Sequence, residues 1–254
     1  MPLFTDGLVS GLEDLTAQDT QLSNVANVEG IDVTQKLALA QEELALEITA
    51  LLTGSRRAEE AFRLNTRPTI DNVVVTPALK LWHTFRTLEM VYGDAYSSQL
   101  NDRYAAKRDQ FDERSKWAYE RLLLMGIGIA WFPVPRPKQP QVISAAGSLP
   151  NGTYYVAMTW VNGKGEEGAP SVPTTITTAG STLLVEPAAA PACATGWNVY
   201  VGSDPDALTR QNASPLTVSQ TWLQANAIAG TGSAPGWGQL PNCLMPMPRV
   251  ILRG

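Results

Sequence analysis

The chain has 254 residues, of which 44% are hydrophobic and 17% are charged, and its formal net charge at pH 7 is −5. This length can supply about two ordinary domain cores. The composition excludes a disordered chain, and two cysteines are too few for a disulfide scaffold. A pI near 5.0 argues against the basic surface that base-reading proteins use.

Composition divides the sequence into two parts. The first 138 residues carry 34 charged side chains and the last 116 carry 9, whereas glycine and proline number 13 in the first part and 25 in the second. The prolines that alternate near the boundary fix φ and predict a stiff, extended connector. We expect an α-helical domain over residues 1–132, this connector over 133–140, a β domain over 141–243 and an extended C-terminal tail over 244–254.

Three helices are predicted in the first part. Asp32 can cap a helix that ends at Gly54, and Thr76 with Pro77 is typical of the start of a second helix. A third is expected over residues 102–124. Their apolar residues recur at helical spacing: Leu37, Leu44, Ile48 and Leu51, then Leu81, Phe85, Leu88 and Tyr92, then Tyr104, Phe111, Ala118, Leu122 and Met125. These patterns predict an antiparallel helical bundle, with the segment before residue 30 less well defined.

The second part has the period of β-strands. Residues 154–161 are β-branched and aromatic, and they run into Asn162-Gly163, a strong hairpin signal. Further strands are predicted over 172–178, 182–185, 197–201 and 218–222. The expected fold class is therefore α+β in separate domains, with the second an immunoglobulin-like or fibronectin-III-like sandwich, although the Cys-Trp-Cys arrangement of true immunoglobulin domains is absent.

The last segment combines prolines that break a helix with an apolar run that is unfavourable in water. We interpret it as a tail that docks on a partner. The residues expected to form this interface are Met247, Pro248, Arg249, Val250, Ile251, Leu252 and Arg253.

The sequence contains little that indicates catalysis. His83, the single histidine, falls in mid-helix opposite the apolar stripe, where a surface or helix-contact role is expected rather than a catalytic one. Cys193 and Cys243 lack CxxC spacing and are expected to be free thiols. Carboxylate pairs fall on charged helical stretches, which are typical of solvated faces. We therefore predict no enzyme activity, no cofactor and no metal site.

Tryptophan gives one further candidate site. Trp160, Trp197 and Trp222 fall in predicted strands and are expected in the core. Trp237 lies between glycines in a predicted loop, so it is a candidate exposed anchor for a partner.

No membrane association is expected from the sequence. The longest apolar run, over residues 122–134, is shorter than the roughly 20 residues that a membrane-spanning helix needs. The first residues also lack the positive region of a secretory signal, which indicates synthesis in a cytoplasm-like compartment.

Two parts of the chain resemble phage structural proteins. Residues 76–82, 88–92 and 102–108 are similar to the helical region of the head-to-tail adaptor (connector, or neck) proteins of tailed bacteriophages. Residues 196–202, followed by Asp204, resemble the fibronectin-III-type modules appended to phage structural proteins.

The resemblance implies a structural virion protein at the head–tail junction, made in the host cytoplasm. Such adaptors form a homo-oligomeric ring, commonly a dodecamer, that docks on the portal protein, contacts a downstream neck or tail protein, and lets DNA pass without sequence-specific binding. It further implies that residues 247–253 extend onto the portal.

Two other readings stay open. The chain could be another neck, tail or surface protein whose β-sandwich binds carbohydrate or a partner protein through Trp237 and nearby loops. It could also be an enzyme, for instance a glycosidase that relies on two carboxylates.

Overall fold

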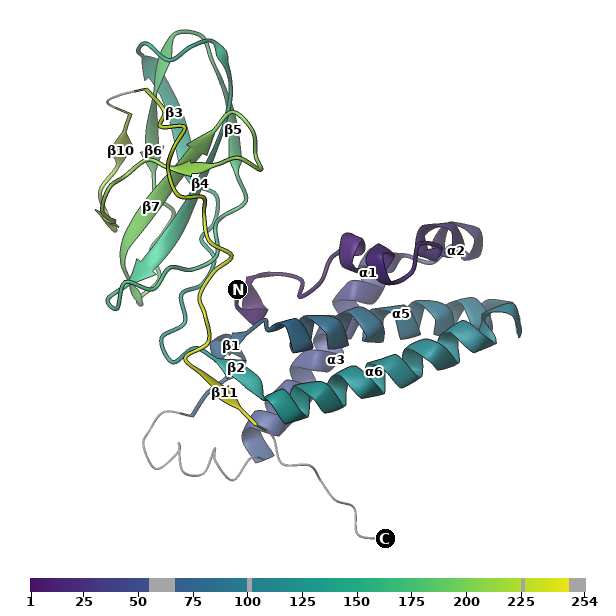
Figure 1. The fold of residues 1–254 in the computed structure, drawn as a ribbon. Coiled ribbons are helices and arrows are strands. Elements are labelled where there is room, and N and C mark those ends of the chain that lie inside the picture. Colours follow the sequence, from purple (N-terminus) through teal and green to yellow (C-terminus); the bar gives the residue numbers. More distant parts are fainter. Residues whose placement is uncertain (55–66, 100–101, 225–226, 247–254) are drawn as a thin grey trace. The chain divides into compact units, whose positions relative to one another are not determined.

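The computed structural model describes residues 1–54, 67–99, 102–224 and 227–246, and the chain divides into two compact units (Figure 1). The helical unit contains Gly7–Trp131 and the segment that begins at Pro241, and the β unit contains Met1–Asp6 and Phe132–Leu240. Helices dominate the N-terminal half and antiparallel sheets the C-terminal half, which confirms the predicted α+β class.

Two long helices of the helical unit, α3 and α5, begin at residues whose side chains cap them. The unit contains α1 (Leu12–Gln18), α2 (Leu22–Glu29), α3 (Val33–Gly54), η2 (Ile70–Asn72), α5 (Pro77–Gln99), η3 (Asp102–Tyr104) and α6 (Ala105–Met125). Before α3, Asp32 Oδ1 accepts hydrogen bonds from the backbone N–H groups of Thr34 and Gln35 at 2.9 and 3.1 Å. Before α5, Thr76 Oγ1 accepts the N–H of Leu79 at 3.4 Å. Both predicted caps are thus confirmed.

Helix α5 is the centre of the helical unit. It packs along α3 and α6 and also contacts α1 and α2 (Figure 1). The predicted stripe of α5 is buried at Phe85, Leu88 and Tyr92, yet the opposite face is buried as well, and His83 is 0% exposed. His83 is therefore a helix-contact residue and not a surface one, because α5 is covered on more than one side.

A three-stranded sheet in the helical unit was not predicted. Strand β2 (Ile127–Ile129) lies between β1 (Val73–Val74) and β11 (Cys243–Met245), and both pairings are antiparallel. The predicted boundary between the β domain and the tail falls between Cys243 and Leu244. In the structure, β11 includes residues on both sides of that boundary and belongs to the helical unit.

The β unit contains two antiparallel sheets. One has the order β10-β6-β3, and the other has the order β5-β4-β7-β8, with β9 also paired to β7. The unit begins with η1 (Phe4–Asp6), and its strands are β3 (Gln141–Ala146), β4 (Gly152–Asn162), β5 (Thr174–Thr178), β6 (Ser181–Glu186), β7 (Ala194–Gly202), β8 (Thr209–Arg210), β9 (Leu216–Thr217) and β10 (Trp222–Leu223).

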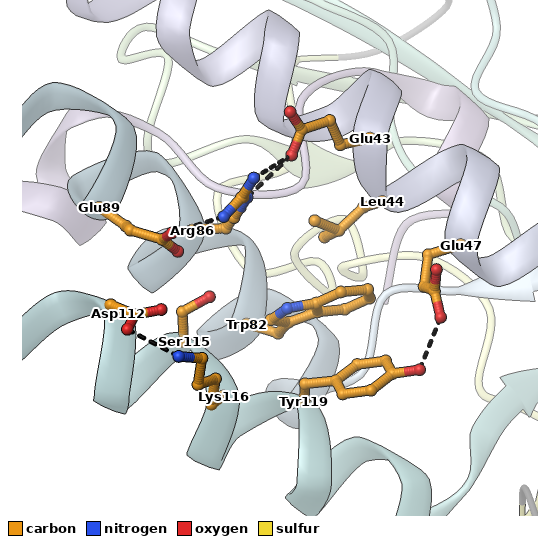
Figure 2. Close-up of a pocket in the computed structure, with 10 residues that line it drawn as sticks. All are labelled: Glu43, Leu44, Glu47, Trp82, Arg86, Glu89, Asp112, Ser115, Lys116 and Tyr119. Carbon is orange, nitrogen blue, oxygen red and sulfur yellow. Dashed lines mark hydrogen bonds and ion pairs between the residues drawn. The ribbon is translucent and has the colours of Figure 1, made fainter. Parts of the chain in front are cut away.

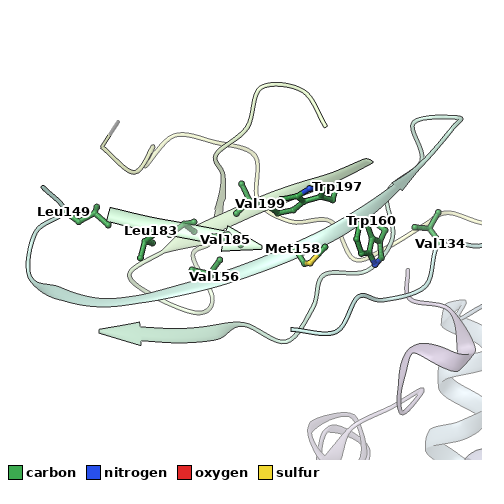
Figure 3. Close-up of a cluster of buried hydrophobic side chains, with 10 residues drawn as sticks. Val134, Leu149, Val156, Met158, Trp160, Leu183, Val185, Trp197 and Val199 are labelled. Carbon is green, nitrogen blue, oxygen red and sulfur yellow. The ribbon is translucent and has the colours of Figure 1, made fainter. Parts of the chain in front are cut away.

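Both sheets contribute to one apolar core (Figure 3). Trp160 of β4 and Trp197 of β7 are almost completely buried in it, and Leu183 and Val185 of β6 are buried with them. Trp222 packs against this cluster from its edge, partly buried. The predicted core positions of the three tryptophans are thus confirmed, with Trp222 at the periphery.

Two strand predictions were inaccurate. Residues 218–222 do not form one strand, because the chain turns between β9 and β10 and Trp197 Nε1 donates hydrogen bonds to the carbonyl groups of Thr217 and Gln220. Strand β3 was missed altogether. Its residues are mostly exposed and include alanine and serine, so it lacks the alternating pattern of a half-buried strand.

Candidate functional site

The predicted docking residues Met247–Arg253 lie outside the described residues. What the structure describes is the segment just before them: Met245 is paired with Ile127, the first residue of β2. The residues just before the tail are therefore held on the helical unit by pairing with β2, the strand that follows α6.

Two glycines permit this attachment. Gly126 ends α6 with a φ of 96°, and a Cβ at this position would lie 2.7 Å from the backbone carbon of Met245. A Cβ on Gly128 would lie 2.8 Å from Thr76 Cγ2 and 3.2 Å from Pro241 Cβ. Strand β11 thus reaches β2 only because both positions lack a side chain.

Trp237, the other predicted site residue, is 87% exposed. Its neighbour Gly238 has a φ of 104°, which favours glycine, and Gln239 is buried. Gln239 Oε1 accepts the N–H of Val134 at 3.1 Å, and its Nε2 donates to the carbonyl of Phe132 and to Glu166 Oε2 at 3.1 and 2.8 Å. The loop therefore holds an exposed indole beside a firmly bonded residue.

His83 makes two buried hydrogen bonds. Its Nε2 donates to the carbonyl of Leu37 at 3.1 Å, so in the neutral ring Nδ1 accepts the hydroxyl of Ser10 at 2.6 Å. Burial lowers the pKa of His83 to about 4. A neutral ring with both nitrogens engaged ties α5 to α3 and to the segment before α1.

Helices α3, α5 and α6 form a groove in the helical unit that no sequence pattern predicted (Figure 2). Here we call it the acidic groove. It comprises two adjoining cavities of about 390 and 560 Å³ that share Glu43, Arg86, Glu89 and Asp112. Seven carboxylates and four cations line it, and the carboxylates are Glu42, Glu43, Glu47, Glu89, Asp94, Asp109 and Asp112.

Arg86 lies at the centre of the acidic groove. Its guanidinium donates to Glu43 Oε2 at 2.8 Å and to Glu89 Oε1 at 2.6 Å, linking α5 to α3 (Figure 2). Partial burial opposes its charge, but these hydrogen bonds outweigh burial and raise the pKa of Arg86. Arg86 therefore stays protonated, and its positive charge is balanced by the carboxylates of Glu43 and Glu89.

An aromatic pair forms the apolar side of the same groove. The rings of Trp82 and Tyr119 have centroids 4.8 Å apart, and the Tyr119 hydroxyl donates to Glu47 Oε1 at 2.6 Å (Figure 2). Burial and the Glu47 carboxylate raise the pKa of Tyr119. On α6, the same helix as Tyr119, Lys116 Nζ lies 2.7 Å from Asp112 Oδ2. The groove thus combines an aromatic surface with an excess of negative charge.

The groove was not predicted because its charged residues come from three helices that are distant in sequence. Each carboxylate reads in sequence as part of a solvated helix face, since residues of α3, α5 and α6 are far apart in the chain. The spacing of Leu39 and Leu46, seven residues apart, was the available signal, because helical spacing places both on one face of α3. They are 40% and 74% exposed, and both line the groove.

Within the described ranges, no group of three or more His, Cys, Asp or Glu residues could hold a metal ion. Cys193 and Cys243 are both free, as predicted, and burial raises the pKa of each thiol. None of the helices in the described part of the chain is long and apolar enough to span a membrane.

Comparison of the sequence with models of protein families found no match, and comparison with curated proteins found none either.

Proposed function

We propose that the chain is a structural virion protein, a head-to-tail adaptor that forms a homo-oligomeric ring, docks on the portal protein and extends the DNA channel toward the tail. The observation that carries the proposal is the pairing of β11 with β2. It attaches the tail to the helical unit, which is the part that resembles the adaptor family. Residues 247–253 would then extend onto the portal from the body that forms the ring.

The finer fold assignments belong to the same proposal. The helical unit would be an antiparallel bundle built around α5, and the β unit an immunoglobulin-like or fibronectin-III-like sandwich. The shared core of the two sheets supports the second assignment, because side chains of the two inner faces fill one apolar layer in such sandwiches. The particle position, at the neck, follows from the adaptor role.

Native mass spectrometry and electron microscopy can test the adaptor role. The full chain is mixed with portal rings from the same particle, and the mass and symmetry of any complex are determined. We expect a stoichiometric ring bound to the portal. It should be lost in an Arg249→Glu/Arg253→Glu variant and kept in a control that reverses two exposed charges elsewhere, Arg121→Glu/Lys138→Glu. Absence of any complex with the unaltered chain would refute the adaptor function.

A second function is favoured by a specific observation, the 87% exposure of Trp237 on a loop held by Gln239. In this alternative the β unit is a binding module for carbohydrate or a partner protein. Binding to a panel of glycans, abolished by Trp237→Ala, would support it. Portal binding should be unaffected by that substitution if the chain is an adaptor.

A further inference from the structure

The acidic groove has more negative charge than its own cations neutralise. Lys36 pairs with Asp94, Arg86 pairs with Glu43 and Glu89, and Lys116 pairs with Asp112.

 Arg108 pairs with Asp109. Glu42 and Glu47 have no ion pair among the described residues, so the groove keeps a net negative charge that favours a cationic occupant.

The groove also exposes apolar surface between these charges. Leu46 is 74% exposed and Leu39 is 40% exposed on α3, and the partly exposed ring of Tyr119, which packs on the buried Trp82, lines the adjoining cavity. An occupant that covered these side chains would gain hydrophobic stabilisation in addition to charge pairing. The chemistry of the groove therefore favours a short segment with apolar residues flanked by cations.

One segment of this chain has that pattern. In residues 247–254, Val250, Ile251 and Leu252 lie directly between Arg249 and Arg253, and the segment has no acidic side chain. We propose that the acidic groove binds this segment of the same chain, with the apolar triplet on the leucine and aromatic side chains and the two guanidinium groups beside unpaired or shared carboxylates.

The place where the segment begins makes this contact feasible. Met245 pairs with Ile127, two residues after α6 ends at Met125, and Tyr119 lies six residues before that end. Six helical residues span about 9 Å, whereas eight extended residues span about 26 Å. Because the segment is tethered, its effective concentration at the groove is on the order of millimolar, and even a weak contact would be substantially occupied.

This proposal goes beyond the adaptor function and does not depend on it, because its test contains no portal. A photoreactive benzoylphenylalanine is placed at position 252 of the full chain, and the products of irradiation are mapped by mass spectrometry. We expect crosslinks within one chain to α3, α5 or α6 at the groove. A Glu43→Gln/Glu47→Gln variant should lower their yield at least threefold.

The matched control removes two carboxylates from the exposed side of α6. A Glu113→Gln/Glu120→Gln variant changes the net charge by the same amount outside the groove, so its crosslink yield should equal that of the unaltered chain. Circular dichroism checks that each variant is folded. Crosslinks elsewhere, an equal loss in both variants, or crosslinks only between two copies of the chain would each overturn the proposal.

Discussion

Cys243 lies directly opposite Ile129 in an antiparallel pair, although Phe132–Leu240 of the β unit separate them in sequence. The chain thus leaves the helical unit after β2 and returns to it beside the same strand. Asn242 reinforces this return, because its N–H donates to the carbonyl of Ile129 and its side-chain Oδ1 accepts the N–H of Trp131, both at 2.8 Å. All of the β unit except Met1–Asp6 is therefore an insertion between two neighbouring strands.

The insertion predicts that the β unit can be replaced by a short turn. A variant that begins at Gly7 and joins Trp131 to Pro241 through an Asn-Gly turn should keep the helical fold, because each end lies two residues beyond the paired Ile129 and Cys243 of adjacent strands. Circular dichroism and thermal unfolding check this. A helical signal below that expected for α1, α2, α3, α5 and α6 together, or a non-cooperative transition, would contradict the insertion.

Gly126 should be intolerant of a side chain. Gly126→Ala places a Cβ 2.7 Å from the Met245 backbone at a φ that disfavours alanine, so we expect unfolding free energy to fall by about 1–3 kcal/mol. Denaturant unfolding measures the loss.

Gly93 provides the control, since it lies within α5 and a Cβ there would meet nothing within 4 Å. Gly93→Ala should raise the unfolding free energy by about 0.5–1 kcal/mol through its helix propensity. Equal effects of the two substitutions would show that β11 does not require the glycine.

Local signals in the sequence were sufficient for the three long helices α3, α5 and α6 and for the strands β4, β5, β6 and β7. Asp32 and Thr76 cap the helices that they were predicted to cap, and Trp160 and Trp197 are buried where β periodicity placed them. These features depend on neighbours a few residues away. They could be predicted because hydrophobic period and capping act over that same range.

Features made by residues distant in sequence were not predictable in this way. Strand β11 has three residues and forms only because β2 offers an unpaired edge, and the burial of His83 depends on α3 and on the segment before α1. The acidic groove likewise needs three helices to be assembled. No local period marks such contacts, so a sequence reading treats each side as a solvated face.

Replacing Trp237 by alanine should change the stability of the protein far less than replacing Trp197. Trp237→Ala should change the unfolding free energy by less than about 0.5 kcal/mol, because the side chain is 87% exposed. Trp197→Ala should cost about 3–5 kcal/mol, because it leaves a cavity in the core and two carbonyl groups without their indole donor. Denaturant unfolding of both variants checks this, and a large loss for Trp237→Ala would show that its loop packs within the chain.

His83 should make stability depend on pH. Its folded pKa of about 4 lies below the ordinary histidine pKa of 6.5, so the unfolded chain binds the proton more tightly and the stabilising contribution is present above pH 6.5. The contribution is lost as the pH falls toward 4, and between pH 7.5 and 5 the loss should be about 2 kcal/mol. Because the sequence has one histidine, its ring proton resonance reports the folded pKa directly by NMR.

A His83→Gln variant isolates this effect from the carboxylates that also titrate in acid. The variant should be less stable at pH 7.5, since it disturbs the hydrogen bonds to Ser10 and Leu37, but its unfolding free energy should fall less between pH 7.5 and 5 than that of the unaltered chain. The difference between the two slopes is the contribution of the imidazole. Parallel slopes, or a ring that titrates near 6.5 in the folded protein, would mean that His83 is open to solvent and does not join α5 to α3 in the manner described.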